Sequence, residues 1–183
     1  SALLYSILYM FGYNISLEDL KNFRKINSKT PGHPEKDVSY GIEVTTGPLG
    51  QGISNGVGMA IASNILKSRF NTDKYNIIDN NIYVMCGDGC LMEGVACEAI
   101  SLAGSLCLDN LIILYDDNNI TIDGKTENTF NDNTEDKFKS MGWDVFVVNN
   151  ANTDVKDISE SIENAKLSKK PSLVILKTKI GFD

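Results

Sequence analysis

Three residues near the middle of the chain have the types and spacing of a site for a divalent cation and a phosphate. Asp88 stands between two glycines, and Asn118 and Ile120 follow about thirty residues later. A carboxylate, an amide oxygen and a backbone carbonyl are oxygen ligands that suit Mg²⁺, which usually keeps further positions for water and phosphate oxygens. Spacing alone leaves a second interpretation open, in which Asp88 lies in the turn that ends a strand and Asn118 caps a loop.

The elements that must position these residues read as a strand, a helix and a parallel strand. The apolar run 82–86 stops at Gly87, the segment 93–106 has the character of a helix, and the apolar run 111–115 leads to Asn118. Ligands of open α/β sheets bind outside the carboxyl ends of the strands. The sequence therefore predicts that Asp88 and Asn118 lie at the mouth of one crevice, on adjacent or nearby strands.

The rest of the chain predicts further elements of an α/β fold. Helices are expected over 2–11, from a cap at Ser16, over 51–70, over 134–141 and from a cap at Thr153, and strands over 144–148 and 172–178. A long irregular segment, 27–49, is more typical of a functional loop than of a simple connection. Continuous apolar strands without alternation indicate a parallel sheet covered on both faces. We predict a doubly wound, mostly parallel sheet with helices on both faces, in a single domain over residues 1–183.

Composition narrows the possible partners. The chain has 183 residues, 42% of them hydrophobic, with a net charge of −7. No basic stripe could neutralise a polyanion, so we expect no nucleic-acid partner. No apolar run has the length of a membrane span, so we expect no membrane partner. The four cysteines show no paired metal-binding spacing, and we expect buried free thiols in a reducing compartment such as the cytoplasm.

The two ends of the sequence suggest a piece of something longer. The chain starts Ser-Ala-Leu-Leu-Tyr without an initiator methionine, inside an expected helix, and stops at Asp183 just after an expected strand. We therefore expect a domain that is truncated at both ends.

Four blocks of the sequence resemble the transketolase family. Gly-Asp-Gly followed by Asn-Asn is the thiamine diphosphate motif, and GDGCLMEG and YDDNNITIDG are similar to the sequences of the family at this motif. The blocks TPGHPE and VTTGPLGQGISN are similar too, and all four stand in the family's order. The match extends from the first helix to the last strand.

The resemblance implies a domain that holds the diphosphate end of thiamine diphosphate through Mg²⁺, which Ca²⁺ or another divalent ion could replace. The implied metal ligands are Asp88, Asn118 and the carbonyl of Ile120. Gly89 would donate its N–H to a diphosphate oxygen. The other implied cofactor contacts are Gly47, Pro48, Leu49 and Glu93.

Three further side chains receive roles from the resemblance. Locally, His33 reads as a surface histidine in a turn, and the resemblance makes it a residue that positions the sugar substrate, with proton transfer as a secondary duty. Glu93 and Glu98 read as solvated carboxylates of a helix. The resemblance instead puts both near the interface of a homodimer.

The implied activity is the transfer of a two-carbon ketol unit from a ketose phosphate to an aldose phosphate, as in the pentose phosphate pathway. The cofactor carries the chemistry, and the protein supplies position and electrostatics. The family's glutamate that activates the cofactor would lie beyond Asp183. We therefore expect the chain alone to be inactive.

Other functions fit the sequence less well. Dihydroxyacetone synthase and deoxyxylulose-phosphate synthase are relatives in the same cofactor class, and TPGHPE and DDNNITIDG argue against the second. A Rossmann dehydrogenase needs G-x-G-x-x-G after its first strand, and here the third glycine is missing. A non-catalytic scaffold would not need Asp88, Gly89 and Asn118 together.

Overall fold

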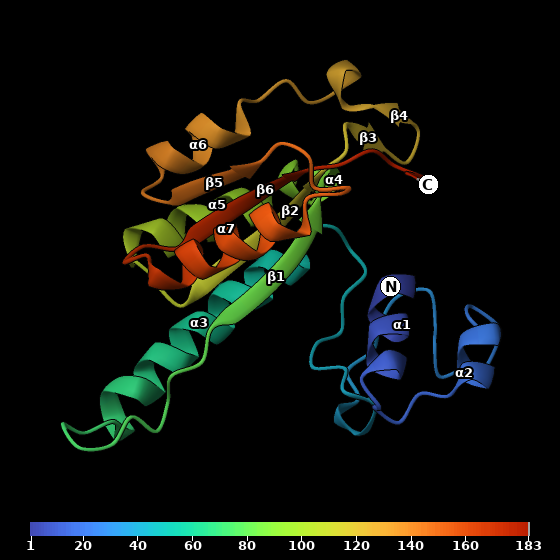
Figure 1. Cartoon of the computed structure of the whole chain (residues 1–183), viewed down its shortest axis with the longest axis horizontal. Helices are drawn as coiled ribbons and strands as arrows, with labels where there is room; N and C mark the ends of the chain where they lie inside the picture. Colours follow the sequence, from blue (N-terminus) through green and yellow to red (C-terminus); the bar gives the residue numbers. More distant parts are fainter. Residues whose placement is uncertain (183) are drawn as a thin grey trace. The chain divides into compact units, whose positions relative to one another are not determined.

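The computed structural model describes residues 1–182 (Figure 1). The chain divides into two compact units, residues 1–48 and residues 49–183. The single domain expected over 1–183 stays a prediction.

The first unit is a small helical cluster. Its apolar core consists of Tyr5, Leu8, Ile15 and Ile42. Its first helix ends before Gly12, whose φ of +78° is the left-handed conformation expected of a residue just past a helix end. The helices are α1 (Ala2–Met10), α2 (Leu17–Lys21) and the 3₁₀ turn η1 (Val38–Tyr40).

The second unit contains the sheet and the longer helices. The helices are α3 (Gln51–Phe70), α4 (Asp88–Leu91), α5 (Gly94–Ser105), η2 (Thr126–Asn128), α6 (Thr134–Ser140) and α7 (Val155–Leu167). The strands are β1 (Ile82–Gly87), β2 (Leu111–Asp117), β3 (Ile120–Thr121), β4 (Gly124–Lys125), β5 (Asp144–Val148) and β6 (Ser172–Lys177).

The main sheet has four strands in the order β1-β2-β6-β5, and every neighbouring pair is parallel. The register pairs Gly87 of β1 with Asp116 of β2, and Asp117 of β2 with Lys177 of β6. The carboxyl ends of the strands therefore meet at one edge, as the sequence predicted. Strands β3 and β4 form a separate antiparallel hairpin just beyond β2.

Helices cover both faces of this sheet, which confirms the predicted fold class. In β2, Leu111, Ile113 and Tyr115 belong to the larger core, whereas Ile112 belongs to a second core that includes Ala165 of α7. The larger core also takes in residues of α3, α5 and α6. Figure 1 shows α5 and α7 on opposite faces. Burial on both faces explains why β2 reads as a continuous apolar run.

One close approach between helices requires glycine. A Cβ built on Gly104 of α5 would lie 1.8 Å from the carbonyl oxygen of Met141, which follows α6. The same junction is held by Trp143, whose indole N–H donates to the carbonyl of Ile100 at 2.9 Å. The two helices can therefore meet only because position 104 has no side chain.

Several details differ from the sequence-based expectations. The cap of α7 is Asp154, whose side chain accepts from the N–H of Asp157, and not Thr153. In β1 exposure does alternate along the strand, since Tyr83 and Met85 are exposed between more buried residues. The helix α7 leaves them uncovered because it packs on β2, β5 and β6. A short helix, α4, follows Gly87 where only a turn was expected.

The four cysteines are free, but they are not all buried. Cys86 is buried, Cys90 and Cys97 are partly buried, and Cys107 is exposed. Cys107 has a φ of +49° in the turn between α5 and β2, a position that faces solvent. The expectation of buried thiols is therefore right for Cys86 and wrong for Cys107.

Across residues 1–182, no helix combines the length and the apolar character needed to cross a bilayer.

Candidate functional site

Asp88 is a buried carboxylate with one oxygen left free. It follows directly on β1, and its residue is only 3% exposed. Its Oδ1 accepts a hydrogen bond of 2.6 Å from the hydroxyl of Tyr115, while its Oδ2 is buried without a partner. A buried charged oxygen is costly unless something pairs with it. This oxygen is therefore suited to act as a ligand of a cation.

Hydrogen bonds to both the nitrogen and the oxygen of the Asn118 amide fix its orientation. Its Nδ2 donates to Oδ2 of Asp116 at 2.8 Å, and its Oδ1 accepts from the backbone N–H of Ile120 at 3.0 Å. An amide oxygen has two lone pairs, so Oδ1 can accept this bond and still ligate a cation. The next residue, Asn119, has a φ of +61°, a left-handed conformation that asparagine tolerates.

The three predicted metal ligands lie on neighbouring elements. Asp88 and Asn118 follow the paired strands β1 and β2, and α4, which begins at Asp88, contacts β3, which begins at Ile120. Residues 1–182 contain no cluster of three or more His, Cys, Asp or Glu side chains suited to a metal. A cation here would therefore depend on amide and carbonyl oxygens besides Asp88, as a Mg²⁺ site with phosphate ligands does.

The start of α3 brings Leu49 to the Gly-Asp-Gly turn. A Cβ on Gly89 would lie 3.1 Å from Cδ1 of Leu49, so these two predicted cofactor contacts lie side by side. At Gly50, with φ +80°, a Cβ would lie 2.8 Å from Cβ of Glu93. The starts of α3 and α5 thus meet around Gly50, which only a glycine allows. Glu93 caps α5 by position and is exposed, and Glu98 is exposed as well.

A cavity of about 240 Å³ opens beside Asp88 at the carboxyl ends of β1, β2, β5 and β6. Four of its side chains are carboxylates and one is a lysine: Asp88, Asp117, Asp132, Glu135 and Lys177. Asn118, Gly89 and Ile120 are not among the residues that line it. The excess of carboxylates makes this end of the sheet favourable for cations.

The pKa values of the titratable groups beside Asp88 respond to their own burial and to the charge of Asp88. Burial, and then the hydrogen bond to Asp88, raise the pKa of the Tyr115 phenol, which therefore stays a donor at neutral pH. Burial, and then the negative charge of Asp88, raise the pKa of Asp117 above its ordinary value. Burial raises the pKa of the Cys86 thiol, two residues before Asp88.

His33 and Gly47 come together within the first unit. A Cβ on Gly47 would lie 3.0 Å from Cγ of His33, so the imidazole lies directly against this glycine. The backbone N–H of Thr46 donates to the carbonyl of Pro34 at 3.1 Å, which ties the two loops together. His33 is exposed, and Pro48 is exposed at the end of the unit. The blocks TPGHPE and TTGP therefore form one paired loop.

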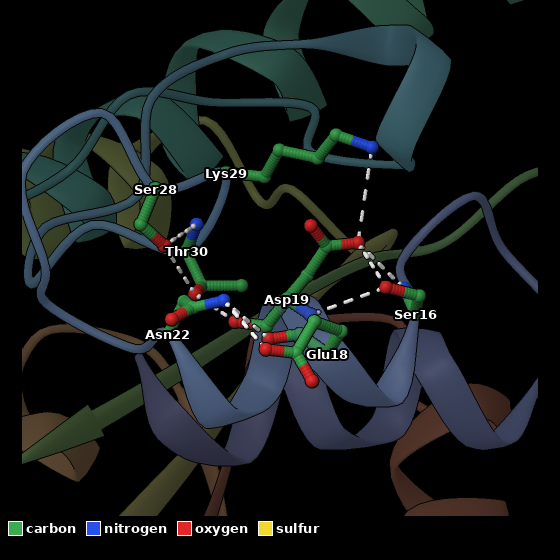
Figure 2. Close-up of polar contacts among 7 residues, drawn as sticks. All are labelled: Ser16, Glu18, Asp19, Asn22, Ser28, Lys29 and Thr30. Atoms are coloured by element: carbon green, nitrogen blue, oxygen red, sulfur yellow. Dashed lines mark hydrogen bonds and ion pairs between the residues drawn. The ribbon is translucent and has the colours of Figure 1, made fainter.

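The His33 loop is anchored to α2 through Thr30 (Figure 2). Thr30 is fully buried, and its hydroxyl donates to the backbone carbonyl of Asp19 at 2.7 Å. Its backbone N–H donates to the hydroxyl of Ser28 at 3.0 Å. Asp19 also accepts from the hydroxyl of Ser16 at 2.6 Å and lies 3.7 Å from the ammonium of Lys29. This network fixes the chain three residues before His33.

Sequence reasoning missed the residues that hold the ligands in place. Tyr115 and Asp116 entered only as the end of a strand, and Thr178 only as the end of another. Thr178 donates its hydroxyl to Oδ1 of Asp116. A polar residue at the carboxyl end of a buried strand is the only signal in the sequence that could have indicated them.

Comparisons with known proteins identify the family of the chain. The family model described as "Transketolase, thiamine diphosphate binding domain" matches residues 1–183. The transketolase of Kluyveromyces lactis is 55% identical over 181 residues, which is 99% of this chain and 26% of that protein. Transketolase 1 of Aliivibrio fischeri is 53% identical over 183 residues, or 100% of this chain and 27% of that protein.

Solved structures match equally well. The structure of transketolase from Leishmania mexicana has a TM-score of 0.96 and 51% identity, over 98% of this chain and 27% of that one. A Pichia stipitis transketolase in complex with sedoheptulose-7-phosphate has a TM-score of 0.96 and 52% identity, with the same two shares covered. The chain thus spans about a quarter of the length of these relatives. It belongs to the transketolase family, and it corresponds to the family's thiamine diphosphate binding domain.

Proposed function

We propose that this chain is the part of a transketolase that binds thiamine diphosphate through Mg²⁺. The observation that carries the proposal is Oδ2 of Asp88, a buried carboxylate oxygen without a partner, on an element that contacts β3. Asp88, Asn118 and the carbonyl of Ile120 would hold the cation, and Ca²⁺ or another divalent ion could replace Mg²⁺.

The contacts to the cofactor itself would come from other turns of the chain. Gly89 would donate its N–H to a diphosphate oxygen, and Leu49, which lies against Gly89, would contact the cofactor through its side chain. Gly47 and Pro48 would add main-chain contacts, and Glu93 stands at the start of α5. Bound thiamine diphosphate supplies an electron sink for breaking a carbon–carbon bond next to a carbonyl.

The proposed reaction is the transfer of a two-carbon ketol unit from a ketose phosphate to an aldose phosphate, in the pentose phosphate pathway of the cytoplasm. The Pichia stipitis relative in complex with sedoheptulose-7-phosphate supports phosphorylated sugars as substrates. His33, which is exposed and lies against Gly47, would hydrogen-bond the sugar and so position it. This chain alone would be inactive.

We also propose that the full-length enzyme is a homodimer with Glu93 and Glu98 near its interface. Both side chains are exposed, Glu93 at the cap of α5 and Glu98 on the helix itself. Three apolar side chains of the same helix region, Val95, Leu102 and Leu106, are 39–50% exposed. Charged residues beside an exposed apolar surface are typical of the rim of an interface.

The test is the Mg²⁺ dependence of cofactor binding by the full-length enzyme. We expect calorimetry to show tight thiamine diphosphate binding with Mg²⁺ and weak binding without it. Asp88→Asn should abolish the difference, because the amide keeps the shape of the side chain but loses its charge. Asp109→Asn, the same change at the amino end of β2, should leave the difference intact. Wild-type binding that ignores Mg²⁺ would overturn the proposal.

A further inference from the structure

Two consecutive residues at the end of β2 each hold one of the proposed side-chain ligands. Tyr115 contacts Asp88, and Asp116 contacts Asn118. Successive residues of a strand point to opposite faces, so a single strand end reaches both ligands. β2 is a central strand with β1 and β6 on either side, which makes its end a rigid support.

The Tyr115 hydroxyl fixes the plane of the Asp88 carboxylate. The phenol is 3% exposed, and its backbone is paired to both Cys86 and Ile175. Its 2.6 Å bond to Oδ1 has the length of a strong bond from a hydroxyl to an ionised carboxylate. Because Oδ1 already has this partner and Oδ2 has none, Oδ2 is the oxygen that most needs a cation.

The Asp116 carboxylate decides which end of the Asn118 amide faces the cation. An ionised carboxylate only accepts hydrogen bonds, so the group of Asn118 that faces it must be the NH₂. The amide oxygen must then point the other way, where it also meets the N–H of Ile120. A flipped amide would lose both hydrogen bonds.

Thr178, directly after β6, holds Asp116 in turn. Its hydroxyl donates to Oδ1 of Asp116, and its backbone N–H donates to the carbonyl of Asp117 at 3.1 Å. The two oxygens of Asp116 are thus divided between Thr178 and Asn118. Loss of the Thr178 hydroxyl would free the Asp116 carboxylate to rotate and would loosen Asn118.

We propose that Tyr115 and Thr178, the latter through Asp116, are positioning residues that aim Asp88 and Asn118 at the bound divalent cation. The inference rests on the proposed function, since it concerns the same metal site. Partners of metal ligands commonly change metal affinity by about 10–100-fold when they are removed. The two hydroxyls come from different strands, so each can be tested alone.

The first test is Tyr115→Phe in the full-length enzyme. We expect the Mg²⁺ concentration for half-maximal thiamine diphosphate binding to rise by about 10–100-fold. The matched control is Tyr5→Phe, which removes another buried phenol hydroxyl, one that donates to the carbonyl of Pro31 at 2.8 Å. Tyr5→Phe should leave the half-maximal Mg²⁺ concentration unchanged. An equal Mg²⁺ response of Tyr115→Phe and wild type would overturn the role of Tyr115.

The second test compares two substitutions of Thr178. Thr178→Val should raise the half-maximal Mg²⁺ concentration, and Thr178→Ser, which keeps the hydroxyl, should restore the wild-type value. Equal values for both variants would overturn the role of Thr178. If Tyr115→Phe does not fold, this pair still tests the part of the proposal that concerns Thr178 and Asp116. A wild-type enzyme without any Mg²⁺ response would instead refute the proposed metal site, so the two failures are distinguishable.

Discussion

Leaving one oxygen of Asp88 without a partner costs free energy in the unliganded protein. For a neutral buried group this cost is about 1–3 kcal/mol, and it is larger for a charged one. Tyr115 satisfies only Oδ1. The side chain is therefore a poor choice for stability alone and a good one for binding a cation, which would pair with the free oxygen.

His33 should affect the substrate rather than the cofactor. Its imidazole is exposed and lies against Gly47, and a neutral hydrogen bond contributes about 0.5–1.5 kcal/mol. We expect His33→Ala in the full-length enzyme to lower kcat/KM for the ketose donor by about 2–10-fold, with the cofactor Kd unchanged.

Steady-state kinetics and cofactor titration together check the role of His33. Lys36→Ala, an exposed change in the same loop, serves as the control. An unaltered kcat/KM in His33→Ala would remove this residue from the site.

Among the elements, the junction of α5 and α6 should tolerate no side chain at position 104. The Cβ of Gly104→Ala would lie 1.8 Å from the carbonyl oxygen of Met141, and backbone cannot step aside as a flexible side chain can. We expect the free energy of unfolding to fall by about 3 kcal/mol, the upper end of the range for overpacking. Urea denaturation measures it.

A glycine elsewhere in the helices provides the matched control for Gly104. Gly58 lies inside α3, and a Cβ there meets nothing within 4 Å. Gly58→Ala should be neutral or stabilising by up to about 1 kcal/mol, since alanine favours helix. Equal effects of the two substitutions would contradict the close approach seen at Gly104.

The stability of the start of α2 should depend on pH through the ionisation of Asp19. Hydrogen bonds from the hydroxyl and the backbone N–H of Ser16 hold the pKa of Asp19 below its ordinary value. A lowered folded-state pKa stabilises the protein above the unfolded value of about 3.9, and this stabilisation is lost as pH falls through the folded pKa.

Asp19→Asn isolates this contribution. We expect it to lower stability near pH 7 by about 1 kcal/mol, as for other helix caps, and to have a diminishing effect below about pH 4. Denaturation curves at several pH values measure the difference, with Asp123→Asn at the exposed hairpin as the control. A difference that does not change with pH would show that the ionised carboxylate has no part in the cap.

The long elements could be predicted from the sequence, and the short ones could not. The helix over 51–70 and the strand over 144–148 have the predicted bounds, because many residues contribute to each pattern. The four residues of α4 depend on contacts with β1 and β2, which no local pattern records. The hairpin of β3 and β4 pairs only two residues of each strand, which is too short for a repeating pattern. At α7 both Thr153 and Asp154 are good caps, and only the structure selects Asp154.

At the candidate site, the sequence indicated the proposed ligands but not the residues that contact them. Asp88, Asn118 and Ile120 stand in a motif, so their types and spacing were informative. The hydroxyl of Thr178 donates to Asp116, which lies 62 residues away in the sequence, and the hydroxyl of Tyr115 donates to Asp88, which lies 27 residues away. Such pairs are set by sheet order and register, and neither can be read from one strand.

For the whole molecule, ligand binding and folding should be linked. A ligand that binds only the folded state stabilises it by about 2.7 kcal/mol at a concentration of 100 Kd. We expect thiamine diphosphate with Mg²⁺ to raise the Tm of the full-length enzyme and a chelator to reverse the rise. Thermal unfolding with cofactor alone is the control. A Tm that the chelator leaves unchanged would argue against the cation.

The buried thiol of Cys86 gives the protein an internal chemical reporter. Cys86 lies two residues before Asp88 at the end of β1 and is 6% exposed, whereas Cys107 is exposed at the far end of the β1–β2 connection. An alkylating reagent should therefore label Cys107 at once and Cys86 only during transient openings of the strand end. The slow labelling rate of Cys86, read by mass spectrometry, would measure how often the end of β1 beside Asp88 opens.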